Sequence, residues 1–241
     1  MSFKIVIPAR LHSTRLPEKI IKLIGEKTVL WYTWQQAVKS HADEVVIATD
    51  NQKIYDICHD FGAKVVMTSV DHPTGTDRIY EACKKFGWSN EQIIVNVQGD
   101  EPLIPVDYIN MLAELLIENK DADVATLAHS ISNQKDKQDP NLVKVVFDKW
   151  HNAIYFSRCQ IPYNGKEFFG HIGIYAYRVN AIKGFVENST GVLEASESLE
   201  QLRFLENGYS IKIGMVQGRA PIGVNTEYDY IKVKEILEEG I

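Results

Sequence analysis

The sequence FKIVIPARLHSTRLPEK, residues 3–19, joins a short apolar run to a polar loop. Residues 5–7 predict a buried strand, because they are apolar and end abruptly at a proline. The loop that follows carries three cations, Arg10, Arg15 and Lys19. Ligands of parallel α/β sheets bind at the carboxyl ends of strands, so these cations favour an anion, most commonly a phosphate. A solvated loop whose cations serve only solubility also fits this stretch when it is taken alone.

The composition is that of an ordinary globular protein, with 241 residues of which 45% are hydrophobic and 24% charged. No run approaches the roughly 18 apolar residues that span a bilayer, and the N-terminus has a strand pattern instead of a signal peptide, so we expect a cytoplasmic protein. The net charge of −6 argues against general binding to nucleic acid or anionic membranes. Cys58, Cys83 and Cys159 lack metal-ligand spacing, and we expect no disulfide framework.

Apolar strands and amphipathic helices alternate through the first half of the chain. We expect strands at residues 5–7, 44–49, 64–67, 93–98 and 124–129, and helices at residues 28–40, 52–60, about 75–86 and 105–119. This order is typical of βαβ units with right-handed crossovers. The pattern therefore predicts an α/β fold with a mostly parallel central sheet.

The last third of the chain changes character. We expect a loop at residues 132–141, a hairpin of 142–147 with 153–156, a strand at 170–178, helices at 179–187 and 193–206, a strand at 211–216 and a final helix at 226–239. Alternation in the strand at 170–178 places His171, Gly173, Tyr175 and Tyr177 on one face. A substrate-facing wall and an aromatic core face fit this pattern equally well. One domain with an inserted substrate-facing subregion is the simplest organisation.

Asp100 directly follows a buried strand and a glycine, so we expect its carboxylate at the same sheet edge as Arg10. Mg²⁺ that bridges phosphates needs one or two such carboxylates and keeps several waters. A simple turn cap is the alternative, but it would not need cations nearby. Gly75 and Thr76 open the next helix, where free backbone N–H groups suit a phosphate or another polar ligand group.

Six short motifs occur in this chain in a fixed order. They are PAR at 8–10 with STRLP at 13–17 and Lys19, GTDR at 75–78, NVQGDEP at 96–102, YFSR at 155–158, HIGIY at 171–175 and LEQLR at 199–203. This set resembles the 3-deoxy-manno-octulosonate (Kdo) cytidylyltransferase family, the CMP-Kdo synthetases, from residue 5 to the final helix. The resemblance implies a Rossmann-like nucleotide-diphospho-sugar transferase fold in one domain, residues 1–241. Its portions would be 1–130 for CTP, 131–220 for the sugar and dimerisation, and 221–241 as a closing helix.

The reaction that the resemblance implies is transfer of CMP from CTP to the anomeric hydroxyl of Kdo, with release of pyrophosphate, for lipopolysaccharide biosynthesis. A homodimer is implied in the same way. Attack of a hydroxyl on an α-phosphate needs in-line positioning and charge neutralisation, which cations and Mg²⁺ supply. No cysteine or serine of the sequence has the surroundings of a covalent nucleophile, which favours direct displacement.

The resemblance also implies roles for individual residues. Catalysis would depend on Arg10, Lys19 and Asp100, and Asp100 would bind Mg²⁺. The nucleotide would be bound by Ala9, Arg10, Lys19, Thr74, Gly75 and Gln98. The sugar acid would be surrounded by Arg15, Gln98, Arg158, His171, Tyr175, Glu200 and Gln201.

Two departures from the family pattern leave alternatives open. Asn225, in GVNT at 223–226, stands where the family has an aspartate as a second Mg²⁺ ligand. It keeps one neutral oxygen, so it fits a metal ligand, a cap, or a site for another sugar such as 8-amino-Kdo. The short link at 160–170 gives Lys166 to Phe169 a different way to close the sugar site. The remaining alternatives are a sugar-1-phosphate nucleotidyltransferase, disfavoured because the first loop is not glycine-rich, and a catalytically impaired nucleotide-binding protein.

Overall fold

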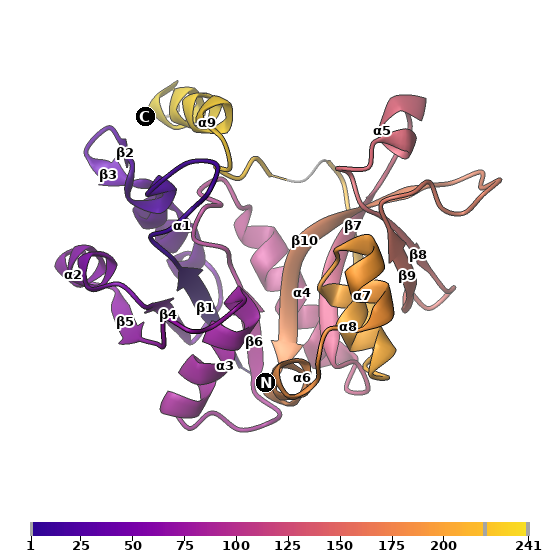
Figure 1. Ribbon diagram of the computed structural model, residues 1–241, viewed down its shortest axis with the longest axis horizontal. Helices are drawn as coiled ribbons and strands as arrows, with labels where there is room; N and C mark the ends of the chain where they lie inside the picture. The colour runs from indigo at the N-terminus through magenta and orange to yellow at the C-terminus, as the bar shows by residue number, and fades with distance from the viewer. Residues whose placement is uncertain (1, 219–220, 240–241) are drawn as a thin grey trace. The chain divides into compact units, whose positions relative to one another are not determined.

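The chain folds into two compact units, one formed by residues up to 110 together with those from 221 onward, and the other by residues 111–220. The computed structural model in Figure 1 describes residues 2–218 and 221–239. None of the helices in these ranges combines the length and the apolar character needed to span a bilayer. The functional division at residues 130 and 220 stays a prediction, and residue 220 itself lies outside the described residues.

A parallel sheet forms the centre of the first unit. Its strands lie in the order β6 (Ile93–Asn96), β1 (Phe3–Ala9), β4 (Glu44–Thr49) and β5 (Lys64–Met67). Val6 pairs in register with Val46 on one side and Asn96 on the other, and the Val6 side chain is fully buried. Helices cover strands of this kind, which explains their near-continuous apolar sequences. The predicted parallel βαβ arrangement is confirmed, and the strands' carboxyl ends share one edge.

Figure 1 shows the helices of this unit, several of which begin at a capping residue. They are α1 (Val29–Val38), α2 (Gln52–Asp60), α3 (Gly75–Lys85) and α9 (Glu227–Glu239), while α4 (Val106–Glu118) starts here and continues beyond residue 110. Thr28 caps α1 by accepting from Trp31 N at 3.1 Å, and Asn51 caps α2 by accepting from Lys53 N at 3.0 Å. Such caps satisfy backbone donors that a helix leaves unpaired at its start.

The stretch after the cationic loop holds structure that the sequence did not predict. Lys19 lies in a short 3₁₀ helix, η1 (Lys19–Ile21), and β2 (Leu23–Ile24) pairs with β3 (Lys27–Thr28). Gly25, with φ of 57°, makes the turn between these two strands, a conformation that glycine adopts without steric cost. This small hairpin leads the chain from the loop into α1.

The second unit is built on a mixed sheet. β11 (Ile211–Val216) runs parallel to β7 (Val124–Ser130), and β7 pairs antiparallel with β10 (Phe169–Arg178). The predicted hairpin is present as β8 (Lys144–Phe147) and β9 (Ala153–Ser157), and β8 also pairs with β10. The helices are α5 (Gln134–Gln138), α6 (Val179–Glu187), α7 (Val192–Glu197) and α8 (Gln201–Glu206).

Two predictions in this unit are wrong. The segment predicted as a loop at 132–141 contains α5, which Asn133 caps by accepting from Asp136 N at 2.8 Å. The single helix predicted at 193–206 is divided into α7 and α8 by Ser198, whose φ is 52°. The carbonyls freed at this break accept hydrogen bonds from Arg158, at 2.8 Å to Glu197 O and 3.2 Å to Ser198 O. Arg158, which is distant in sequence, therefore stabilises this break, which has no glycine or proline to predict it.

Candidate active site

A polar cavity of about 360 Å³ lies in the first unit where β1 and β6 end. Its lining residues are Pro8, Arg10, His12, Ser13, Thr14, Arg15, Lys19, Ile20, Gly75, Gln98, Gly99 and Asp100. The structure thus places the three loop cations, the carboxylate of Asp100 and the start of α3 around one space. His12, Ser13 and Thr14 also line it, although none of the three was predicted as a site residue.

Close approach of two backbones brings Asp100 to this cavity. A Cβ atom added to Gly99 would lie 3.2 Å from both Pro8 O and Leu30 Cδ1, tighter than ordinary van der Waals contact. The carbonyl of Gly99 accepts from Thr33 Oγ1 at 3.2 Å, which ties the same turn to α1. Glycine is needed where a chain passes this close to another, so Gly99 sets the position of the following carboxylate.

The cations of the cavity bond to nearby carboxylate, amide and carbonyl oxygens. Lys19 Nζ forms an ion pair with Asp100 and also donates to Asn225 Oδ1 at 3.1 Å. Arg15 Nη2 donates to the same Asn225 oxygen at 3.3 Å, and Arg10 Nη1 donates to Pro73 O at 3.3 Å. Their side chains are therefore held at the cavity by contacts that an incoming anion can join or replace.

Glu101, the residue after Asp100, has a carboxyl group in a buried environment. Burial raises the pKa of Glu101 to about 8, the Asp100 charge adds to this rise, and Lys19 opposes it. Glu101 Oε2 is buried and has no hydrogen-bond partner within residues 2–218 and 221–239. The protonated form is favoured near neutral pH. Asp100 is thus the carboxylate that supplies negative charge here.

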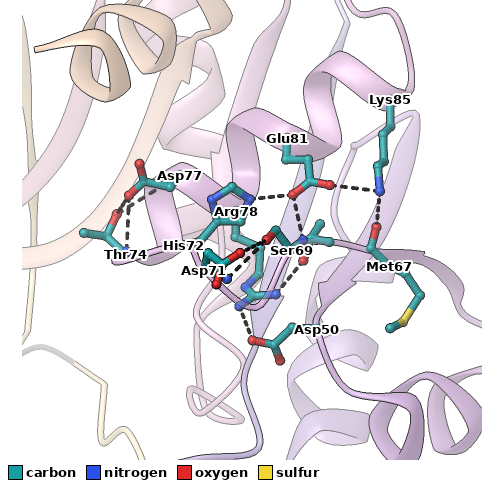
Figure 2. A network of polar contacts seen from close by, with 11 residues as sticks. Asp50, Met67, Ser69, Asp71, His72, Thr74, Asp77, Arg78, Glu81 and Lys85 are labelled. Atoms are coloured by element: carbon teal, nitrogen blue, oxygen red, sulfur yellow. Dashed lines mark hydrogen bonds and ion pairs between the residues drawn. The ribbon is translucent and has the colours of Figure 1, made fainter.

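The segment before α3 is held against that helix by a polar network (Figure 2). Thr74 and Asp77 form a capping box, with Asp77 N 3.3 Å from Thr74 Oγ1 and Thr74 N 3.2 Å from Asp77 Oδ2. Arg78, which is fully buried, donates to Thr68 Oγ1 and to Asp50 Oδ2, each at 2.5 Å. These contacts fix the backbone that leads to Gly75 at the cavity.

Glu81 is the centre of the same network, as Figure 2 shows. Its carboxylate accepts from Ser69 N at 2.8 Å, contacts His72 Nε2 at 2.5 Å and pairs with Lys85 at 2.9 Å. Burial alone would raise the pKa of Glu81, but these hydrogen bonds lower it to about 2. Neither Glu81 nor Asp50, the partner of Arg78, was predicted from the sequence, because Ser69, His72 and Asp50 come close to this helix only in the fold.

Residues of the second unit form a separate aromatic group on β10. The His171 side chain is 8% exposed, and its Nε2 lies 2.9 Å from Thr126 Oγ1. Burial lowers the pKa of His171 to about 3, so the imidazole is neutral. The Tyr175 ring lies 5.5 Å from that of His171 and 5.7 Å from that of Tyr177. Burial, followed by Tyr177 and Glu200, raises the pKa of Tyr175 well above its usual value.

Arg158 is positioned by Glu197, a residue that the sequence did not single out. Glu197 Oε2 accepts from Arg158 N at 2.8 Å, and Glu197 Oε1 accepts from Ser157 Oγ at 2.6 Å. Arg158 Nη1 donates to Pro140 O at 3.2 Å, in addition to its bonds to the break between α7 and α8. Glu197 lies outside the quoted motifs, so the only signal would have been its partners in the fold.

Glu200 and Gln201 lie at the start of α8. Glu200 is the exposed N-cap residue, whereas Gln201 is buried, with only 5% of its surface exposed. Gln201 Nε2 is buried and has no hydrogen-bond partner within the described part of the chain. An unpaired buried amide costs free energy, and a ligand hydroxyl or carboxylate would supply its missing acceptor.

The predicted site residues therefore fall into two sets. The first unit holds Ala9, Arg10, Arg15, Lys19, Thr74, Gly75, Gln98, Asp100 and Asn225, and the second holds Arg158, His171, Tyr175, Glu200 and Gln201. Gln98 Nε2 donates to Asn96 Oδ1 at 3.0 Å, which fixes its amide at the end of β6.

A parallel α/β sheet with a cationic cavity and a carboxylate at its carboxyl edge defines a protein of the nucleotide-binding α/β class. A family model described as cytidylyltransferase matches residues 4–213. The chain belongs to this cytidylyltransferase family. Its full-length relatives are named 3-deoxy-manno-octulosonate cytidylyltransferases.

Full-length relatives and a solved structure agree with this assignment. A 3-deoxy-manno-octulosonate cytidylyltransferase of Francisella tularensis subsp. holarctica is 50% identical over an alignment of 243 residues that covers 97% of each chain. The protein of the same name from Cellvibrio japonicus is 45% identical, with 100% of each chain covered. The structure of a CMP:2-keto-3-deoxy-manno-octonic acid synthetase complexed with CTP superposes with a TM-score of 0.93 at 34% identity, again over 100% of each chain.

Proposed function

We propose that this protein transfers CMP from CTP to the anomeric hydroxyl of Kdo and releases pyrophosphate. The observation that carries the proposal is the convergence of Arg10, Arg15 and Lys19 with Asp100 around one cavity at the carboxyl edge of a parallel sheet. Such an edge is where α/β proteins bind nucleotides, and the cations match the charge of a triphosphate. The full-length similarity to named Kdo cytidylyltransferases supports the choice of CTP and of the sugar acid.

In this reaction the sugar hydroxyl oxygen forms a bond to the α-phosphorus, and the bond from that phosphorus to the β-phosphate oxygen breaks. The hydroxyl proton leaves to solvent or to a base, and pyrophosphate carries the electron pair. Arg10 and Lys19 would bind the triphosphate and neutralise charge that grows on its oxygens. Ala9, Thr74, Gly75 and Gln98 would line the cytidine. Positioning and charge stabilisation of this kind supply most of the catalysis in phosphoryl transfer.

Nucleotidyltransferases of this kind generally use a divalent metal, and we propose that Asp100 would hold Mg²⁺ here. Within the described residues, no group of three or more His, Cys, Asp and Glu side chains could hold a metal by itself. One carboxylate fits Mg²⁺ nonetheless, since this ion commonly binds one or two carboxylates together with substrate phosphates and waters. The bound ion would neutralise phosphate charge. Lys19, which pairs with Asp100, would then be released toward the triphosphate.

Five of the residues predicted to bind the sugar acid belong to the second unit. Arg158 carries a guanidinium suited to a carboxylate, and the unpaired amide of Gln201 is suited to a sugar oxygen. The neutral His171 would accept or donate a hydrogen bond without adding charge. Tyr175 and Glu200 would complete this set.

We also propose that two copies associate through the second unit, that the protein acts in the cytoplasm, and that its product serves lipopolysaccharide biosynthesis. Support for the dimer comes from large apolar side chains that are exposed near the β8–β9 hairpin: Trp150 is 64% exposed, Ile154 61% and Tyr163 87%. Exposed apolar groups of this size commonly mark interfaces. Light scattering coupled to size exclusion would give twice the chain mass, and a monomer at micromolar concentration would contradict the dimer.

The direct test mixes protein, CTP, Mg²⁺ and Kdo and follows pyrophosphate release together with the mass of CMP-Kdo. Parallel reactions contain 8-amino-Kdo, or a sugar 1-phosphate with CTP, UTP or dTTP. We expect release with CTP and Kdo. Release only with 8-amino-Kdo would change the substrate, release with a sugar 1-phosphate would change the class, and CTP binding without any release would indicate an impaired catalyst.

A further inference from the structure

Asn225 holds two of the three cavity cations. Its Oδ1 lies 3.1 Å from Lys19 Nζ and 3.3 Å from Arg15 Nη2, and both groups donate to it. These cations belong to the loop after β1, whereas Asn225 precedes α9. A carboxamide oxygen accepts two hydrogen bonds through its two lone pairs, so both contacts can form together.

The backbone around Asn225 is fixed independently of these contacts. Val224 N donates to Asp100 O at 2.8 Å, and the fully buried Val224 side chain lies in an apolar cluster with Leu16, the neighbour of Arg15. On the other side, Asn225 N donates to Asp229 Oδ2 at 3.2 Å, and Thr226 N donates to the same oxygen at 2.8 Å. Asn225 is therefore a rigid anchor at the edge of the cavity.

The anchor is neutral, and this matters for the charge of the site. An amide oxygen orients a cation without neutralising it, whereas a carboxylate at the same position would form ion pairs with Lys19 and Arg15. A carboxylate at this position would attract both cations and would compete with a phosphate for them. With Asn225, Asp100 is the carboxylate already paired with Lys19, and Arg15 keeps its charge for a ligand.

We propose that Asn225 is a positioning residue that presents Arg15 and Lys19 to the phosphates of CTP without neutralising them. The side-chain cations are consequently available to bind the triphosphate. A carboxylate at position 225 would pair with these cations, and a metal ion would then be needed to compensate for its negative charge. This inference rests on the proposed function, because CTP is the ligand. It assigns Asn225 to the cations and not to a metal.

The test measures CTP binding by calorimetry, first in EDTA and then with saturating Mg²⁺, for wild type, Asn225→Asp and Asn225→Ala. In EDTA we expect Asn225→Asp to weaken binding about 10-fold, because the new charge pairs with the cations and repels the triphosphate. Asn225→Ala should weaken it about 3-fold, since the cations lose their anchor but keep their charge. Mg²⁺ should recover most of the loss in Asn225→Asp and little of the loss in Asn225→Ala.

Asn90→Asp is the matched control, because Asn90 is exposed in the loop that enters β6, at the opposite edge of the sheet from Asp100. It should bind CTP as wild type does. Equal affinity of wild type and Asn225→Asp in EDTA would overturn the inference while leaving the proposed function intact. A loss in Asn225→Ala seen only with Mg²⁺ would overturn it in favour of a metal ligand. Failure of wild type to bind CTP under both conditions would overturn the proposed function and this inference together.

Discussion

Arg78 and Asp50 form an ion pair in which the guanidinium is fully buried and its Nη2 lies 2.5 Å from Asp50 Oδ2. Asp50 directly follows β4, and Arg78 lies in α3, so the pair joins the carboxyl end of a central strand to the helix that starts at the cavity. A buried cation without a partner is costly, because the charge has lost its water. This pair therefore links the stability of the first unit to the position of Gly75.

Replacement of Asp50 tests that link. Asp50→Ala should lower the free energy of unfolding by about 3 kcal/mol, because it leaves the Arg78 charge buried and uncompensated. Urea denaturation measures the loss. The double variant Asp50→Leu/Arg78→Met should be more stable than Asp50→Ala, and Asp60→Ala, at an exposed position, should change stability by less than about 0.5 kcal/mol. A loss below about 1 kcal/mol in Asp50→Ala would contradict the prediction.

Lys19→Met tests the triphosphate site. The variant removes a cavity cation that we propose binds the triphosphate, so kcat/KM for CTP should fall on the order of 100-fold, as when one donor to a developing charge is deleted. Steady-state pyrophosphate release gives this ratio. Lys39→Met removes the same charge from an exposed position at the end of α1 and should stay within about 2-fold of wild type. Equal losses in both variants would show that only the net charge matters.

His171 should make stability depend on pH. Burial holds its folded pKa at about 3, below the ordinary value of 6.5, so the unfolded chain binds more protons between these values. Stability is thus fully present above about pH 6.5 and decreases as pH falls toward 3. The contribution is on the order of 5 kcal/mol, from about 1.4 kcal/mol for each pKa unit.

Unfolding of His171→Gln and wild type should be compared across this range of pH. The variant should show a flatter decline, whereas His41→Gln, at an exposed position, should follow the wild-type slope. Parallel curves for His171→Gln and wild type would indicate that the folded protein protonates this imidazole as readily as the unfolded chain does.

Glu197→Gln tests the positioning of Arg158. The change preserves the shape of the side chain but removes the charge of the carboxylate that accepts from the Arg158 backbone N and from Ser157 Oγ, so KM for the sugar acid should rise about 10-fold, while KM for CTP changes less than about 2-fold. Glu187→Gln, in which the replaced side chain is 60% exposed, is the control and should leave both constants unchanged. A rise confined to the KM for CTP would place Arg158 on the nucleotide instead.

Local sequence was sufficient to predict a structural feature when the interactions behind it span only a few residues. The near-continuous apolar run at β1 predicts a buried parallel strand, and Thr28, Asn51 and Thr74 mark helix starts because their side chains bond the backbone two or three positions later. The expectation that Arg10 and Asp100 meet at one edge needed only the rule that parallel strands end on the same side.

Features set by distant partners could not be predicted in this way. The break at Ser198 is bonded by Arg158, and Glu81 is bonded by Ser69 and His72 of the segment before α3. These partners are distant in sequence, unlike Lys85, which pairs with Glu81 from the next turn of the same helix. The aromatic face of β10 illustrates the mixture: alternation grouped His171, Tyr175 and Tyr177, but the register shift between Ile172 and Tyr175 came with the fold.

The sequence by itself determined the α/β class, the order of the elements and the cationic loop after the first strand, because these follow from the spacing of apolar residues and from side chains that act on nearby backbone. Only the tertiary structure decided which groups meet: Asp50 with Arg78, Glu197 with Arg158, and Asn225 with Arg15 and Lys19. The physical reason is that an ion pair or a buried polar contact depends on distance in space, which the packing of Val224 beside Leu16 sets here and residue spacing along the chain does not.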